Sequence, residues 1–397
     1  MNGVTVRPLG EVAALQAGVG FPLDLQGRSN GKYPLAKVGD ISRGGRSGEA
    51  VLSSADHFVD EIDLERLRAK PIPAGSVLFA KIGEAIRQNH RVIAGCPLLI
   101  DNNAMAAIPG PEIESRYLYY FLRTVDFYRV ASATTVPALR KSELERIGVP
   151  LFALPEQRRI AEVLDRAEAL RAKRRAALAQ LDTLTQSIFL DLFGDPDRGS
   201  NEWPSVMLGD VAEIITGYPF RSQEYQGPAD GVRLCRGANV MPSRLDWSDL
   251  ACWPAGRTDS MADFNLVPGD IVLAMDRPWI SEGFKLAEVR ASDCPALLVQ
   301  RVARLRGKTG VSNAFLLHTL GQPAFARHCR PTETTIPHIS PKEIRSFTFS
   351  FPPLALQQDF AHRIAAVDKL KSAHRASLAK LDALFASLQH RAFRGEL

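Results

Sequence analysis

Thr134-Thr135-Val136-Pro137 returns 200 residues later as Thr334-Thr335-Ile336-Pro337, and this repeat decides how the whole chain is organised. From these residues onward the two copies stay in register without a gap over 60 positions, of which 17 are identical. The openings also repeat, since Leu9-Gly10-Glu11-Val12-Ala13 returns as Leu208-Gly209-Asp210-Val211-Ala212. Similarity at a fixed period indicates an internal duplication, here of a module of about 200 residues.

Composition is that of an ordinary globular protein, with 45% hydrophobic and 23% charged residues in 397. This length can form two or more domains with full cores. The net charge of +5 and the pI near 9.0 permit a polyanion as partner without requiring one.

The sequence predicts a cytoplasmic protein that does not cross a membrane. It contains no apolar run of 18 residues, and the opening Met1–Thr5 lacks the basic and apolar regions of a signal peptide. Five cysteines, an odd number without close spacing, are typical of reduced thiols.

Two kinds of sequence pattern alternate along the chain. Residues 1 to about 150 and the corresponding part of the second copy hold short apolar runs broken by Gly and Pro, such as Ser76–Ala80 and Val92–Ala94, which predict strands. Tyr117–Leu122 predicts a short helix. Each copy is therefore predicted to begin with a mixed α/β globule.

A long helix is predicted to follow each globule, because Pro155 to about Phe193 contains no Gly and no further Pro. At 1.5 Å per residue, about 38 residues make a helix of roughly 57 Å. Apolar residues recur in steps of three and four, as in a coiled-coil seam. The predicted seam residues are Ile160, Leu170, Leu181, Leu184 and Ile188 in the first helix and Phe360, Leu370, Leu381, Leu384 and Leu388 in the second.

Each seam is interrupted by a polar residue at the same place, Arg174 in the first copy and His374 in the second. Such a residue lowers stability but fixes the register of a helix pair. Two matching seams predict that the helices pair with each other, in antiparallel orientation. The alternative is that each helix packs only on its own globule.

The predicted fold class is therefore α/β (α+β), a pseudo-twofold tandem repeat with two globular domains separated by a pair of long antiparallel coiled-coil helices. The predicted boundaries are 1–153 for the first globule, 154–194 for the first helix, 195–204 for a linker, 205–352 for the second globule and 353–397 for the second helix.

Common catalytic motifs are missing from the sequence. No lysine has an acidic residue two positions before it, as a nuclease site of the Asp/Glu-x-Lys type requires. The string nearest to an amino-methyltransferase loop, Phe351-Pro352-Pro353-Leu354, lacks both ends of that motif. Neither a phosphate-binding loop nor zinc-ligand spacing is found. The sequence therefore nominates no catalytic residue, metal ligand or cofactor site.

Along its full length the chain resembles the specificity (S) subunits of type I restriction-modification systems. The resemblance rests on Leu154-Pro155-Glu156-Gln157 at the start of the first helix and on the closing Arg394-Gly395-Glu396-Leu397. Gly75–Lys81 and Gly269–Ala274 also resemble a strand motif of that family. One departure is Leu354–Gln358, where the second helix begins without the Leu-Pro-x-Glu-Gln pattern, which puts a standard partner contact there in doubt.

The resemblance implies a DNA sequence-specificity subunit without catalysis of its own. Each globule, as a target-recognition domain, would read one half of a bipartite site in double-stranded DNA, and the helices would set the gap. Two methyltransferase subunits would dock and bring S-adenosylmethionine; restriction subunits, if present, would use ATP and Mg²⁺. The expected location is the prokaryotic cytoplasm, at the nucleoid.

Candidate DNA contacts are basic or polar residues on loops beside the repeated strands, because phosphates and base edges are contacted by such side chains. For each residue the alternative is a solvated charge or a turn cap. The candidates are Lys37, Lys81, Arg87, Asn89, Thr135, Arg236, Arg277, Arg301, Thr335 and His338. A basic cluster, Arg171 and Lys173–Arg175, could contact DNA or a partner, although charged helix faces are usually just solvated.

Two other functions stay open. A coiled-coil scaffold could pair protein partners without reading DNA, and specific DNA binding with steep salt dependence would exclude it. A self-sufficient nuclease or methyltransferase with an unfamiliar site is the other alternative, and the missing motifs argue against it.

Overall fold

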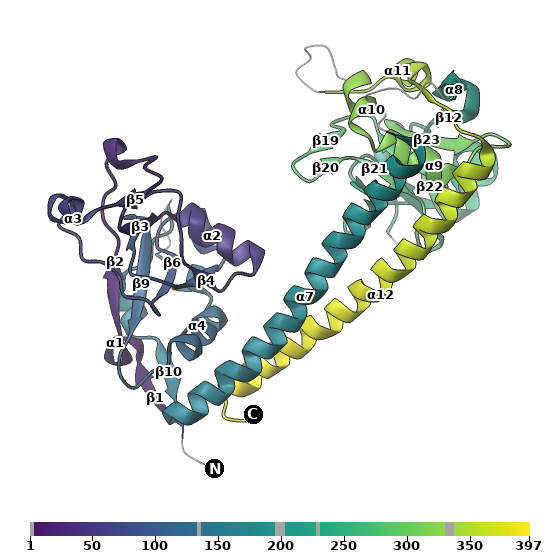
Figure 1. Cartoon of the computed structure of the whole chain (residues 1–397). Coiled ribbons are helices and arrows are strands. Elements are labelled where there is room, and N and C mark those ends of the chain that lie inside the picture. The colour runs from purple at the N-terminus through teal and green to yellow at the C-terminus, as the bar shows by residue number, and fades with distance from the viewer. Residues whose placement is uncertain (1–3, 133–135, 195–202, 228–230, 330–336) are drawn as a thin grey trace. The chain divides into compact units, whose positions relative to one another are not determined.

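The computed structural model describes residues 4–132, 136–194, 203–227, 231–329 and 337–397. The chain forms two compact units (Figure 1). Unit 1 comprises Met1–Ala177 and His374–Leu397, and unit 2 comprises Leu178–Ala373. Each unit thus contains one globule together with one half of each long helix.

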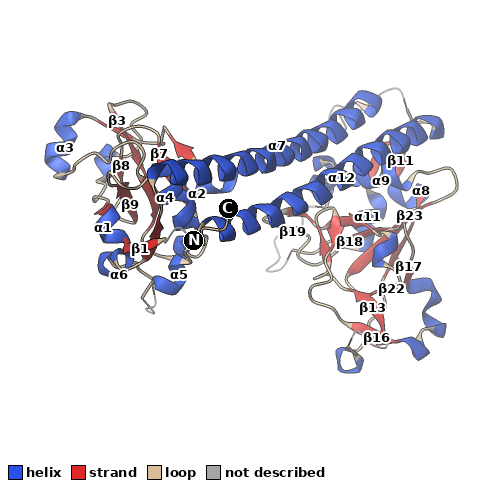
Figure 2. Ribbon diagram, turned by 90° about the horizontal axis from the view of Figure 1, so that it is seen from below, coloured by secondary structure: helices blue, strands red, loops and turns tan. Residues whose placement is uncertain are grey.

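Unit 1 is built on a five-stranded sheet of order β2-β9-β6-β7-β4 and a three-stranded sheet of order β5-β3-β8. Strands are drawn in red in Figure 2. The strands are β2 (Ala13–Ala17), β3 (Tyr33–Ala36), β4 (Val51–Leu52), β5 (Phe58–Val59), β6 (Val77–Ala80), β7 (Arg91–Ala94), β8 (Leu99–Ile100) and β9 (Ala104–Pro109). A separate pair joins β1 (Thr5–Pro8) to β10 (Gly148–Leu151).

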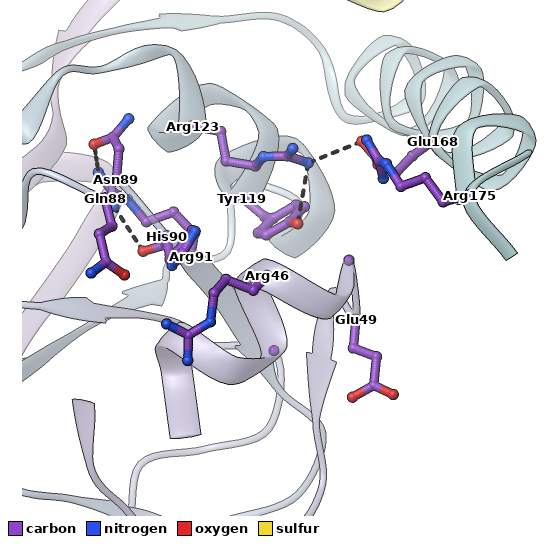
Figure 3. Close-up of a pocket in the computed structure, with 13 residues that line it drawn as sticks. Arg46, Glu49, Gln88, Asn89, His90, Arg91, Tyr119, Arg123, Glu168 and Arg175 are labelled. Atoms are coloured by element: carbon purple, nitrogen blue, oxygen red, sulfur yellow. Dashed lines mark hydrogen bonds and ion pairs between the residues drawn. The ribbon is translucent and has the colours of Figure 1, made fainter. Parts of the chain in front are cut away.

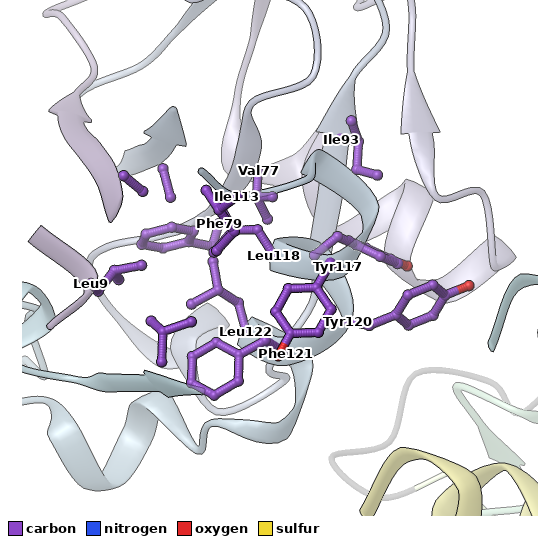
Figure 4. Packing of buried hydrophobic residues seen from close by; sticks show 14 of the residues in the cluster. Leu9, Val77, Phe79, Ile93, Ile113, Tyr117, Leu118, Tyr120, Phe121 and Leu122 are labelled. Atoms are coloured by element: carbon purple, nitrogen blue, oxygen red, sulfur yellow. The ribbon is translucent and has the colours of Figure 1, made fainter. Parts of the chain in front are cut away.

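Six helices complete the globule of unit 1: α1 (Leu9–Val12), α2 (Val38–Ser47), α3 (Glu61–Leu67), α4 (Ser115–Thr124), α5 (Phe127–Val130) and α6 (Lys141–Glu145). The largest core lies around α4 (Figure 4), where six consecutive residues, Tyr117 to Leu122, are all buried. Phe79 of β6 and Phe385 of the C-terminal helix belong to the same cluster. The core of unit 1 therefore joins the sheet to the long helices.

Unit 2 repeats this plan. Its main sheet has the order β12-β23-β18-β21 and a second sheet the order β16-β13-β22-β17. The strands are β12 (Ala212–Thr216), β13 (Gly231–Cys235), β16 (Cys252–Pro254), β17 (Asn265–Leu266), β18 (Ile271–Ala274), β21 (Leu286–Glu288), β22 (Ala296–Leu298) and β23 (Val302–Gly307). Shorter pairs join β11 (Ser205–Met207) to β24 (Thr348–Ser350), β14 (Val240–Met241) to β15 (Arg244–Leu245), and β19 (Trp279–Ile280) to β20 (Gly283–Phe284).

The short helices of unit 2 are α8 (Leu208–Val211), α9 (Asn313–Leu320), α10 (Pro323–His328) and α11 (Pro341–Ser346). Short 3₁₀ segments lie in both units, at Leu23–Leu25, Glu84–Ile86, Ser222–Glu224, Ala255–Arg257, Asp259–Phe264 and Ala291–Asp293. Two tight contacts repeat as well: a Cβ on Gly18 would meet the Asp101 carbonyl oxygen at 1.9 Å, and a Cβ on Gly217 that of Val299 at 2.3 Å. Only glycine fits at this approach, so the duplication preserves it in both copies.

The long helices α7 (Leu154–Phe193) and α12 (Leu354–Ala392) pair in antiparallel orientation within each unit. In unit 1, Arg171 Nε lies 2.6 Å from Asp382 Oδ1. In unit 2, Lys371 Nζ lies 2.9 Å from Asp182 Oδ1. These contacts are one interaction seen twice, because 171 and 371, like 182 and 382, are equivalent positions of the repeat.

The polar interruptions of the predicted seam also meet, since Arg174 Nη1 lies 3.2 Å from His374 Nδ1 in unit 1. The helix pairing predicted from the sequence is therefore confirmed, and the alternative of two helices packed only on their own globules is wrong.

The exact seam differs from the sequence prediction at four leucines. Leu170 and Leu370 are each 52% exposed, Leu184 is 43% exposed and Leu384 is 49% exposed. The side chains that form ion pairs with the opposite helix lie one position after Leu170 and Leu370, at Arg171 and Lys371. The apolar pattern predicts a leucine at the contact between the helices. In the structure the aliphatic parts of the Arg171 and Lys371 side chains cover this contact, and their charged ends pair with an aspartate of the other helix. The other six predicted residues, Ile160, Leu181, Ile188, Phe360, Leu381 and Leu388, are buried or half-buried.

A buried glutamine attaches each long helix to its globule. In unit 1 the side chain of Gln157 accepts a hydrogen bond from the Glu114 N–H at 2.8 Å and donates to the carbonyls of Glu112 and Phe152 at 2.9 and 2.8 Å. In unit 2 Gln357 accepts from the Ser312 N–H and donates to the Pro352 carbonyl, both at 2.9 Å. Both glutamines are fully buried, so their loss leaves backbone groups unpaired.

All five cysteines are free thiols. In the part of the chain that the structure describes, no helix is long and apolar enough to cross a membrane.

Substitution of Gln157 tests the attachment. We expect Gln157→Ala to lower the free energy of unfolding of unit 1 by about 2–4 kcal/mol, because three buried backbone groups lose their partner and a cavity forms. Denaturant unfolding followed by circular dichroism measures the change. Gln358→Ala, on the exposed face of α12, is the control; equal effects of the two substitutions would contradict the assignment.

Candidate nucleic-acid interface

In unit 2, three of the predicted DNA-contacting residues come together around Asp276, directly after β18. The backbone of Asp276 forms an isolated antiparallel bridge with His338. The Arg277 N–H donates to the Pro337 carbonyl at 2.9 Å. Arg301 Nε lies 3.6 Å from the Asp276 carboxylate. Arg277, Arg301 and His338 are all exposed, so this cluster presents two guanidinium groups and an imidazole to solvent.

Backbone conformation gives a second reason to regard this cluster as functional. Arg277 and Arg301 have φ angles of +46° and +68°. A left-handed conformation costs an L-residue other than glycine roughly 1–2 kcal/mol. The position in unit 1 that corresponds to Arg277 is Gly83, with φ of +85°. Unit 2 therefore holds an arginine where glycine suffices for the turn, and such strain is common at functional sites.

Unit 1 has the same backbone arrangement with a different set of side chains. The Gly83 N–H donates to the Pro137 carbonyl at 2.8 Å, and the Leu139 N–H donates to the Lys81 carbonyl at 2.9 Å. Lys81 is half-buried at this loop. Thr135 and Thr335, also predicted as DNA contacts, lie outside the described residues.

Lys37 and Arg236, two of the candidate DNA contacts, follow β3 and β13 respectively; Lys37 is the N-cap residue of α2, and Arg236 precedes a turn. The Lys37 N–H donates to Asp40 at 2.8 Å and the Arg236 N–H to Asn239 at 3.2 Å. Their side chains are engaged within their own units: Lys37 Nζ donates to Gln26 at 2.8 Å, and Arg236 pairs with Asp249 at 3.1 Å. These contacts give both residues a structural role, and their contact with DNA stays a prediction.

Arg87 and Asn89 lie on the loop before β7, and each has a partner. Arg87 pairs with Glu84 at 2.6 Å and lies over the Tyr128 ring, 4.1 Å from its centroid. Asn89, with φ of +53°, accepts a hydrogen bond from Arg91 at 2.7 Å.

Asn89 also lines a pocket of about 460 Å³ in unit 1 (Figure 3). Its walls come from the C-terminal end of α2 (residues 44–46) with Gly48 and Glu49, from residues 88–91, from α4 and from α7. The structure thus brings the predicted polar loop next to Arg175, a member of the basic cluster predicted separately on the helix.

Glu168 of α7 is a hub of charge pairs at this pocket. It contacts Arg171 at 2.7 Å, Arg175 at 3.3 Å and Arg123 at 3.4 Å. The Arg123 guanidinium also lies 5.3 Å from the centroid of the Tyr119 ring. Arg91, by contrast, has no carboxylate partner among the described residues. Burial lowers the pKa of its guanidinium to about 9, and Arg123 adds to that shift.

Sequence reasoning missed Arg46, Arg91 and Arg123, which line this pocket. Arg91 carried a signal, because it is a charged residue directly before the apolar run Val92–Ala94 and belongs to the buried strand β7. Arg46 and Arg123 carried none, since each is one arginine among many in the sequence.

Among the described residues, no group of three or more His, Cys, Asp or Glu side chains is arranged to hold a metal ion. The sites described above carry basic and polar side chains, which suit an anionic partner.

Comparisons with known proteins find similarity to proteins of type I restriction-modification systems. Residues 1–180 match the family described as the type I restriction modification DNA specificity domain. The EcoAI specificity subunit of Escherichia coli is 33% identical over 170 residues, which cover 42% of this chain and 28% of that protein. The MjaVIII specificity subunit of Methanocaldococcus jannaschii is 26% identical over 277 residues, covering 65% and 64%. The chain thus spans between about a quarter and two thirds of these two relatives.

Two solved structures share the fold over the whole chain. The type I restriction-modification S subunit from M. genitalium aligns with a TM-score of 0.58 and 14% identity, covering 99% of this chain and 97% of that one. A chain from a study of complex assembly and conformational transition of the type I R-M system aligns with a TM-score of 0.57 and 19% identity, covering 100% and 99%. This chain thus shares its fold with these two solved chains. The chain is thus similar to type I restriction-modification specificity subunits, in sequence over residues 1–180 and in fold over its whole length.

The exposed cluster of unit 2 can be tested by one charge change. We expect Arg277→Gln to weaken DNA binding about threefold to tenfold and to reduce the slope of log K against log salt by about 1, because one phosphate contact is lost. The melting temperature should not fall, since the strain at φ > 0 does not depend on the charge. Lys308→Gln is the control; this exposed residue follows β23, at the end of the strand away from Arg301. An equal loss of DNA affinity in both variants would contradict a role for Arg277.

Proposed function

We propose that this chain is the DNA sequence-specificity subunit of a type I restriction-modification complex and carries no catalytic step itself. Each globule reads one half of a bipartite site in double-stranded DNA. The single observation that supports this most is the repeated loop after β6 and β18, which is the same backbone in both units but carries different side chains. One scaffold used twice with different contacts suits a site whose two halves differ.

The helices α7 and α12 set the gap between the halves in this proposal and dock two methyltransferase subunits. Four leucines support a docking role, because Leu170, Leu184, Leu370 and Leu384 are about half exposed on the helix pair. They are equivalent in pairs, since each pair is separated by 200 residues. Two equivalent apolar surfaces suit two copies of the same partner.

The partners bring the chemistry. The methyltransferase subunits carry S-adenosylmethionine and methylate adenines in the two half-sites. Restriction subunits, where the system has them, add ATP- and Mg²⁺-dependent cleavage. The complex acts in the prokaryotic cytoplasm, at the nucleoid.

DNA binding by the complex of this chain with its methyltransferase partner tests the proposal against the scaffold alternative. A duplex containing both half-sites should bind at least 10³-fold more tightly than an unrelated duplex, with steep salt dependence. Scrambling either half should remove most of that preference. A folded complex that binds all duplexes equally would support a scaffold.

The role of the helices as a ruler has a test of its own. Three heptads inserted between Ala177 and Leu178, and again between Ala373 and His374, preserve the seam and lengthen each helix by about 32 Å. This is close to one turn of DNA, so the preferred gap should grow by about nine or ten base pairs. Selection from a library of gap lengths measures it. Insertion in one helix alone is the control and should abolish binding; an unchanged gap would contradict the ruler.

A further inference from the structure

The pocket of unit 1 has an excess of positive charge that its own carboxylates do not neutralise. Four arginines and two glutamates line it. Glu168 is fully engaged by Arg123, Arg171 and Arg175. Arg46 is exposed at the pocket and makes no ion pair with a described residue, and neither does Glu49. The pocket therefore keeps unneutralised guanidinium groups.

Arg91 is the most informative of these residues, because it is only 4% exposed and still has no acidic partner among the described residues. Its Nη1 donates to the His90 carbonyl at 2.8 Å and its Nη2 to Asn89 Oδ1 at 2.7 Å. Its guanidinium lies over the Phe127 ring, 3.8 Å from the centroid. Buried charges in proteins are normally paired, because an isolated one loses its hydration without compensation.

Two buried nitrogen atoms in residues that line the pocket, Arg91 Nε and His90 Nδ1, have no hydrogen-bond partner. Both residues belong to the lining and lie side by side in Figure 3. Such atoms in a folded protein call for a partner. An anion bound in the pocket would supply the negative charge that the Arg91 guanidinium lacks among the described residues.

The end of α2 also contributes to the lining, through Gly44, Gly45 and Gly48. It packs closely on β7 and the residue before it, because a Cβ on Gly44 would meet Val92 Cγ1 at 2.9 Å and one on Gly45 would meet His90 Cβ at 2.6 Å. The C-terminus of a helix carries about half a negative charge, which opposes an anion. The Gly44 carbonyl, however, already accepts hydrogen bonds from Ser47 Oγ and the Glu49 N–H, at 3.1 and 3.0 Å. The lining contains four arginines against two glutamates, and this excess of two full charges is larger than the partial charge of the helix end.

We propose that this pocket binds a phosphate group. Guanidinium groups suit phosphate oxygens because they offer paired N–H donors and stay charged at neutral pH. The source we infer is the DNA backbone, an assignment that rests on the proposed function. The pocket adjoins the loop of Arg87 and Asn89, predicted from the sequence as a DNA contact.

This site is particular to unit 1. In the sheet register Arg91 pairs with Phe79, and the equivalent pair in unit 2 is Leu286 with Leu273. Unit 2 thus has a leucine where unit 1 has the buried arginine. Unit 1 holds the DNA backbone through this pocket, whereas unit 2 presents the exposed cluster of Arg277 and Arg301.

Two substitutions with opposite effects test the site. Arg46→Gln removes a cation, and Glu49→Gln removes an anion, from exposed positions of the pocket. We expect the first to weaken phosphate binding about threefold to tenfold and the second to strengthen it by a similar factor. Misfolding cannot explain a gain. Arg68→Gln, at the C-cap of α3 and exposed, is the matched control in the same unit.

The full chain is measured with two probes. The first is inorganic phosphate, compared with chloride at equal ionic strength, and the readout is the rise in melting temperature of each variant. The second is a short duplex, and the readout is the slope of log K against log salt, which should fall by about 1 in Arg46→Gln. Effects on both probes support a DNA phosphate; an effect on inorganic phosphate alone supports a free phosphate as ligand.

If neither probe distinguishes Arg46→Gln and Glu49→Gln from Arg68→Gln, the pocket is not a phosphate site. Failure of the proposed function looks different. In that case the wild-type complex shows no preference for any DNA sequence. The change in melting temperature with inorganic phosphate still shows whether the pocket binds phosphate.

Discussion

The pairing of the two long helices is the interaction on which the rest of the structure depends. It is made twice by equivalent residues, as Arg171 with Asp382 and as Lys371 with Asp182. Each contact combines a helix from one copy with a helix from the other, so neither copy of the repeat completes its unit alone. Phe385 of the second copy lies in the core of unit 1, and Phe189 of the first copy lies in that of unit 2.

The two copies of the repeat share their backbone geometry at several positions where their side chains differ. The buried Gln157 and Gln357 attach the helices in the same way, and the loops after β6 and β18 share their hydrogen bonds. At those loops, however, Gly83 corresponds to Arg277, and in the neighbouring strands Arg91 corresponds to Leu286. Positions that define the fold are shared, whereas positions that could meet a ligand differ. This division supports recognition of two unlike half-sites by one scaffold.

Much of the fold could be predicted because the same pattern of residues occurs in both copies of the repeat. The helix spans, the antiparallel pairing and the meeting of Arg174 with His374 all follow from a repeat read in register. The exact seam did not follow, because the apolar pattern favours Leu170 and Leu370, whereas the contacts use the stems and charges of Arg171 and Lys371. The pocket of unit 1 could not be predicted either. It assembles residues from α2, β7, α4 and α7, and no sequence spacing relates them.

The measurement that tests the central claim most directly is the pattern of methylated adenine in a host without adenine methylation of its own, expressing this chain with the methyltransferase subunit of the proposed complex. Single-molecule sequencing should show one motif made of two short, different halves with a gap of fixed length. Exchange of residues 1–153 for those of another specificity subunit should alter one half and leave the other unchanged. A continuous motif, or changes in both halves after that exchange, would contradict the account.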